Sequence, residues 1–128
     1  MRKKSLSFLF LLLLSATPVK ALSATSHQNG VTATLPDCVK VSEKAVLRID
    51  STRHLPAGAF WRVDVTWSGK PLNSSPEVLA GVPETDIRFS VPGKYRCTVE
   101  TGIVTKGSCA GVTYDKLSTH VFDIEVQE

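Results

Sequence analysis

The sequence predicts an all-β fold, an antiparallel β-sandwich of about seven short strands. The clearest sign is the stretch from Trp61 to Ser68, in which large apolar residues alternate with polar ones. A period of two places the apolar side chains on one face of a half-buried strand and the polar side chains on the other. After residue 24, no stretch carries apolar residues at the spacing of an amphipathic helix.

The same alternation defines the other expected strands along the chain. Residues that share a face are, in order, Val31, Ala33 and Leu35; Val39 and Val41; Ala45, Leu47 and Ile49; Trp61, Val63, Val65 and Trp67; Ile87, Phe89 and Val91; Tyr95, Cys97 and Val99; Phe122, Ile124 and Val126. Glycine and proline turn sequences separate many of them, and the turns lie at 55–58, 68–71, 92–93 and 106–108.

Residues 1–24 have the pattern of a secretory signal peptide. A short basic start precedes the apolar run Leu6–Leu14, and small residues with a proline follow. The run is shorter than the roughly 20 apolar residues of a transmembrane helix. We expect cleavage after Ala21 or Ala24, and therefore a periplasmic or secreted protein without an integral membrane segment after cleavage.

Cleavage would leave one domain with little net charge. The full chain has 15 basic and 12 acidic residues, and removal of Arg2, Lys3, Lys4 and Lys20 leaves 11 against 12. A net charge of −1 gives no basic field for nucleic acid, so no nucleic-acid partner is expected. We expect a flexible N-terminal arm at residues 25–30 and one sandwich domain at residues 31–128.

Two segments resemble immunoglobulin-like domains. Val65–Leu72 is similar to their third strand and the following hairpin, and Thr85–Cys97 is similar to their fifth strand, turn and sixth strand. Tyr95 stands two residues before Cys97, as in the tyrosine corner of that superfamily. The resemblance implies an immunoglobulin-like sandwich, of the bacterial immunoglobulin-like or PKD-like (polycystic-kidney-disease-like) single-domain type. It does not specify an activity, because such folds carry many.

Three cysteines remain after cleavage, so one bridge and one leftover thiol are expected in an oxidising compartment. A bridge between Cys97 and Cys109 would join the last hairpin, and Cys38 is the alternative partner of Cys109. The third cysteine is either a small buried apolar residue or the link of a disulfide-linked dimer. In antibody-type domains the first cysteine stands on the second strand, where this chain has Leu47 and Ile49, so the bridge of that family is not expected.

The chain carries no recognisable catalytic motif. It has no phosphate-binding glycine loop, no CxxC, no HExxH and no Gly-x-Ser-x-Gly, and its histidines stand far apart at positions 27, 54 and 120. We therefore expect no enzyme and no cofactor. We expect His120 at a strand end, partly packed against the core, and His54 in a solvated loop.

Copper is the alternative ligand. If cleavage follows Ala24, the chain begins Thr25-Ser26-His27, and its amine, two amides and imidazole could hold Cu(II) in a square plane. A periplasmic Cu(II)-binding protein is thus a second hypothesis, which cleavage after Ala21 would remove.

The leading hypothesis is a non-catalytic protein-binding module of adhesin, effector or inhibitor type, whose partner the sequence does not identify. We expect Ile103, Val104 and Lys106 near the tip of a hairpin loop, with Arg53 and His54 as weaker contact candidates. The alternative is that Ile103 and Val104 extend the sixth strand into the core.

Overall fold

The computed structural model describes residues 23–107 and 111–128. The expected signal peptide falls almost entirely outside these residues, and so does Cys109. The described residues form strands and no helix: β1 (Ser23–Gln28), β2 (Val31–Pro36), β3 (Cys38–Lys40), β4 (Lys44–Ser51), β5 (Ala59–Gly69), β6 (Glu77–Leu79), β7 (Glu84–Arg88), β8 (Gly93–Gly107) and β9 (Gly111–Gln127).

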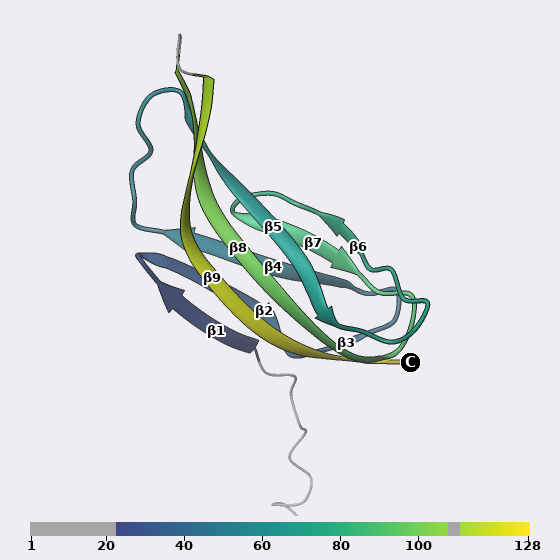
Figure 1. Cartoon of the computed structure of the whole chain (residues 1–128). Helices are drawn as coiled ribbons and strands as arrows, with labels where there is room; N and C mark the ends of the chain where they lie inside the picture. Colours follow the sequence, from purple (N-terminus) through teal and green to yellow (C-terminus); the bar gives the residue numbers. More distant parts are fainter. Residues whose placement is uncertain (1–22, 108–110) are drawn as a thin grey trace, which may run out of the picture.

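These strands form two sheets that pack face to face (Figure 1). Sheet A has the order β1-β2-β4-β7-β6, and sheet B has the order β3-β9-β8-β5. Every neighbouring pair is antiparallel except β3 and β9, which are parallel. The expectation of an all-β sandwich is confirmed.

The core is built from the alternating residues that predicted the strands. Leu47 of β4, Ile87 of β7 and Val99 of β8 are fully buried, and Phe122 of β9 is nearly so. Three aromatic rings pack together at the core. The ring centroids of Phe89 and Tyr95 lie 4.7 Å apart, and Trp67 packs edge-on against both rings. Such edge-on packing is favourable for aromatic quadrupoles.

The segment that we expected to be a flexible arm is a strand in the structure. Ser23–Gln28 pairs with β2 along its whole length, so residues 25–28 of the expected arm are paired strand. Asn29 and Gly30 have φ of 51° and 76°, the left-handed pair of a two-residue hairpin turn. Asn-Gly is the strongest sequence signal for a two-residue hairpin turn. Asn29 and Gly30 are the last two residues of the segment 25–30 that we expected to be an arm.

The last hairpin is much longer than the alternation predicted. Strands β8 and β9 pair from Gly93–Val126 to Gly107–Gly111, and their far end extends beyond the ends of β2 and β4 (Figure 1). A bulge interrupts this ladder, because Thr101 faces Ser118 whereas Gly102 faces Lys116. The extra residue, Leu117, reverses which face the β9 side chains occupy beyond this point.

Candidate functional site

The far end of sheet B carries an exposed aromatic surface on the face turned away from the core. Tyr95, Cys97, Val99 and Thr101 of β8 face the core, so Val104 faces outward. Phe60 on β5 and Tyr114 on β9 stand directly opposite Val104, one on each side. We name the outer-face patch by its six residues: Phe60, Arg62, Val104, Lys106, Val112 and Tyr114.

The outer-face patch exposes apolar side chains and buries the residue at its centre. Phe60 is 47% exposed, Val112 64% and Tyr114 37%, whereas Val104 is only 6% exposed between its neighbours. Cations lie over both rings: Arg62 Cζ is 5.3 Å from the Tyr114 centroid, and Lys106 Nζ is 6.0 Å from the Phe60 centroid. Such cation–π contacts hold long side chains against aromatic faces.

Tyr114 is held in place by its hydroxyl as well as by its ring. The hydroxyl donates a hydrogen bond to Glu100 Oε2 at 2.8 Å. Desolvation, followed by the bond to Glu100 and the nearby negative charges, raises the pKa of Tyr114 to about 12. The phenol is therefore neutral and a donor throughout the physiological range.

Gly102 makes room for the Tyr114 ring. A Cβ added at Gly102 would overlap this ring and would also lie 2.6 Å from the carbonyl oxygen of Asp115. The glycine thus lets an aromatic ring cover the backbone of the adjacent strand, an arrangement that also pins strand register.

The β1–β2 turn braces the bulge that turns Tyr114 outward. Asn29 Nδ2 donates to the carbonyl oxygen of Leu117 at 2.6 Å, and the Thr119 amide donates to Gln28 Oε1 at 2.5 Å. Arg53 Nε in turn donates to the carbonyl oxygen of Asn29 at 2.9 Å. The first of these bonds satisfies the carbonyl of Leu117, the residue that the bulge takes out of the ladder.

A buried chain of polar side chains lies beside the bulge. Thr101 bonds Ser118, Ser118 bonds His120 Nε2 at 2.9 Å, and His120 Nδ1 bonds Ser26 of β1 at 2.7 Å. His120 is 1% exposed in the middle of β9, so placing it at a strand end, partly packed, was wrong. Burial, and to a smaller extent the charge of His27, lowers the pKa of His120.

This chain of hydroxyls and an imidazole ties two sheets together rather than facing a substrate. Ser118 and His120 are both about 1% exposed. In the described parts of the chain, every buried side-chain nitrogen and oxygen has a hydrogen-bond partner. A satisfied network of this kind specifies how strands dock.

The structure distributes the expected contact residues over three places. Val104 and Lys106 lie in the outer-face patch, while Ile103 is half-buried on the opposite face of β8. These residues stand within paired strand and not in a loop tip, because β8 continues to Gly107. The alternative that the sixth strand extends through them is the observed one, although Val104 faces away from the core.

Arg53 and His54 lie apart from that patch, in the exposed loop between β4 and β5. His54 is exposed as expected, and Arg53 braces the β1–β2 turn. Sequence reasoning missed Phe60, Val112 and Tyr114. The signal that could have found them is a large apolar residue at a position where the alternation predicts a polar one. Phe60, directly before the alternating stretch Trp61–Ser68, is such a residue.

The structure gives no support to a bridge at Cys97. Cys38 and Cys97 carry free thiols, and burial raises the pKa of Cys97 to about 11. Gly107 stands ten residues along β8 from Cys97, about 33 Å in extended strand. Since a bridge needs Cα atoms within about 7 Å, a Cys97–Cys109 bridge requires β8 to leave its described pairing. Cys109 lies outside the described residues, and its pairing stays a prediction.

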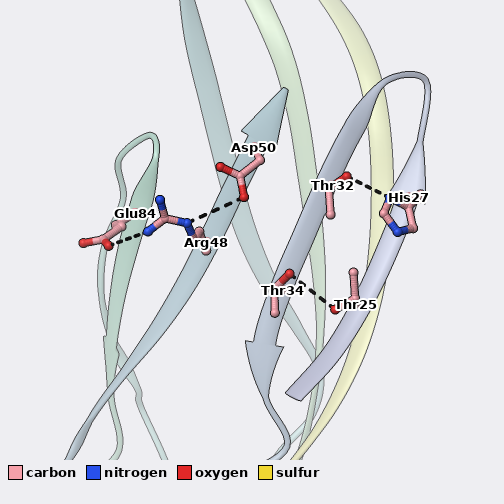
Figure 2. A network of polar contacts seen from close by, with 7 residues as sticks. All are labelled: Thr25, His27, Thr32, Thr34, Arg48, Asp50 and Glu84. Carbon is pink, nitrogen blue, oxygen red and sulfur yellow. Dashed lines mark hydrogen bonds and ion pairs between the residues drawn. The ribbon is translucent and has the colours of Figure 1, made fainter. Parts of the chain in front are cut away.

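The expected copper ligands lie within a paired strand of the structure. Thr25, Ser26 and His27 are extended in β1, with Ser26 turned toward His120 and His27 on the opposite face. Figure 2 shows His27 Nδ1 bonded to Thr32 at 2.8 Å, beside the Thr25–Thr34 pair and the Arg48 ion pairs of sheet A. A square-planar chelate would require β1 to leave β2. Among the residues described, no three His, Cys, Asp or Glu side chains group as a metal site.

Comparison with models of protein families, with curated proteins and with solved structures finds no match to this chain. Within residues 23–107 and 111–128, no helix is long and apolar enough to cross a membrane.

Proposed function

We propose that this chain is an exported, non-catalytic protein-binding module that works in the periplasm or outside the cell. The observation that carries the proposal is the outer-face patch, in which two aromatic rings and Val112 stand exposed on paired strands. Clustered exposed aromatics with cations are typical of binding surfaces, where Tyr, Phe and Arg anchor a partner. Their fixed positions reduce the entropy lost on binding.

We also propose that the sandwich is immunoglobulin-like. The order β2-β4-β7-β6 corresponds to strands A, B, E and D of that fold, and β9-β8-β5 corresponds to G, F and C. Tyr95 supports the same assignment, because its hydroxyl donates to the carbonyl oxygen of Val91 at 2.5 Å, as in a tyrosine corner. Strand β1 would then be an addition at the edge of sheet A.

The composition of the patch favours a partner that presents an apolar side chain beside carboxylates. Lys106 of the patch forms no salt bridge with any described residue, and neither does Lys116, which follows Tyr114 by two residues on β9. Arg62, by contrast, is paired with Asp64 at 3.0 Å. An approaching carboxylate would therefore find two cations not yet neutralised, next to the exposed rings.

The proposal is tested by replacing the exposed apolar residues of the patch. The double variant Phe60→Ser, Val112→Ser removes apolar area without emptying the core. Cross-linking in the exported fraction, followed by mass spectrometry, should identify a partner that wild type retains and that the double variant loses at least about tenfold.

Leu79→Ser is the matched control, since Leu79 is 72% exposed on the outer face of sheet A. It should retain the partner fully. A partner lost on Leu79→Ser but kept by the double variant would place the binding surface on sheet A and contradict the proposal. Circular dichroism of all variants confirms that each one is folded.

A further inference from the structure

Strand β5 is the longest of the four strands that end a sheet. It ends sheet B and, within the described residues, pairs with β8 alone. The other three edge strands are β1 with 6 residues, and β3 and β6 with 3 residues each, against 11 residues in β5. A long edge presents a row of backbone donors and acceptors that can pair with another strand.

The edge has no proline, lysine or early bulge to prevent such pairing, and its two charges, Arg62 and Asp64, have opposite sign. Residues 59–66 contain no proline and no lysine, and the irregularity in the β5–β8 ladder comes only later, between Trp67 and Gly69. In Figure 1, β5 runs along the border of sheet B. The Ala59 amide already donates to the carbonyl oxygen of Pro56, so residues 60–66 are the stretch available for edge-to-edge pairing.

Symmetry restricts how two copies of β5 can pair. Residues that face each other across an antiparallel pair point to the same face of the sheet, while successive residues of one strand point to opposite faces. A two-fold axis normal to the sheet must therefore pass between the two strands, at a point where a residue faces the same residue of the second copy. Arg62, Val63 and Asp64 are the three central choices.

Charge separates these three registers. An axis at Arg62 or Asp64 would place identical charges directly opposite each other, which is unfavourable. An axis at Val63 places Arg62 of each copy opposite Asp64 of the other, on the outer face. On the inner face it places Trp61 opposite Val65, two apolar residues that are partly buried against the core.

We propose that a second copy of this chain docks on β5 edge to edge, in antiparallel register about Val63, and joins two B sheets into one. Arg62 and Asp64 already form an ion pair within one chain at 3.0 Å, with 54% and 42% of their side chains exposed. Pairing two copies would assemble these charges into a ring of four with alternating sign. Arg62 also belongs to the outer-face patch, but the inference does not require that patch to bind a partner.

The test uses charge reversal in the exported protein, under reducing conditions that remove any disulfide-linked dimer. Sedimentation velocity over a concentration series should show a reversible dimer for wild type. R62D and D64R each place like charges opposite each other twice, and each should weaken the dimer about tenfold or more. Mixing R62D with D64R restores both opposite-charge pairs across the interface, so a heterodimer should form.

The matched control is R48D, which changes the net charge by the same amount on β4, away from any edge. A mixture of R48D and D64R keeps one opposite-charge pair and places two arginines opposite each other, so its heterodimer should be weaker than that of R62D with D64R. Wild type that stays monomeric to millimolar concentration overturns the inference. So does a dimer that neither R62D nor D64R weakens, or a mixture of those two variants that does not associate. Because both side chains are exposed, each variant tests the contact separately if the other does not fold.

Discussion

His120 is a titratable residue that the fold buries in order to join β1 to β9. Its two ring nitrogens bond Ser26 and Ser118, so the neutral imidazole satisfies its surroundings with one donor and one acceptor. Protonation would turn both nitrogens into donors in a site from which water is excluded. Burial and the charge of His27 accordingly lower the pKa of His120.

The lowered pKa predicts a loss of stability in mild acid. As pH falls below the ordinary histidine pKa of about 6.5, the unfolded chain takes up a proton before the folded chain does. The free energy of unfolding should be constant above this pH and should decrease below it. Urea titrations between pH 7.5 and 5 measure the slope, which His120→Gln should reduce.

His54→Gln provides the comparison, because it removes an exposed imidazole from a loop. It should keep the wild-type slope between pH 7.5 and 5. A slope that is unchanged in His120→Gln would show that another group causes the pH dependence.

At the scale of elements, the bulge between β8 and β9 determines where the candidate site lies. Without Leu117 as an extra residue, Tyr114 would face the core side together with Ser118 and His120, because all three positions are even. The bulge shifts Tyr114 to the outer face, opposite Val104 and above Gly102. The β1–β2 turn supports this shift through the bond from Asn29 to the carbonyl of Leu117.

We therefore predict that Asn29→Gly destabilises the protein by about 1 kcal/mol, the net value of one hydrogen bond. Glycine tolerates the φ of 51° at this position, so the loss reports chiefly on the missing amide donor. Urea unfolding followed by tryptophan fluorescence measures the change.

Asn73→Gly is a matched control for the turn variant. Asn73 also has a positive φ, 59°, but its side chain makes no hydrogen bond with a described residue. The two variants change chain flexibility alike. Equal destabilisation by both would mean that the Leu117 bond contributes nothing.

The alternating sequence predicted the strands that bury one face along their whole length. It did not predict the full extent of β8 and β9, whose pairing register changes at the bulge. Alternation over Val31–Leu35, Ala45–Ile49 and Trp61–Trp67 located β2, β4 and β5, since each has a single buried face. The bulge interrupts that period, and 111–116 carries polar residues on both faces. Parity alone therefore could not place Tyr114 or extend β9 to Gly111.

The candidate site was predicted only in part for the same physical reason. Val104 and Lys106 were selected as contact residues from a presumed loop, and they do lie in the outer-face patch. Phe60 joins them through the pairing of β5 with β8, two strands far apart in the chain, whereas Tyr114 joins them through the register of the β8–β9 hairpin. A single sequence contains the residues of such a surface but not their register.

At the scale of the whole molecule, the position of signal cleavage bears on the completeness of sheet A. Strand β1 begins at Ser23, where it faces Pro36, and Ala24 faces Leu35 and packs against the core. Cleavage after Ala21 leaves all of β1 in place. Cleavage after Ala24 removes its first two residues, with one packed methyl group and part of the ladder.

We predict that a chain beginning at Leu22 is more stable than one beginning at Thr25, by about 1 kcal/mol for the lost packing and backbone bonds. Thermal unfolding of the two purified forms measures this difference, and the intact mass of the exported protein shows which form the cell makes. Equal stability would mean that Ser23 and Ala24 add nothing to the sheet. In a chain that begins at Thr25, chelation of Cu(II) and pairing of β1 with β2 would compete. The amides that would bind Cu(II) belong to the strand that holds Ser26 against His120.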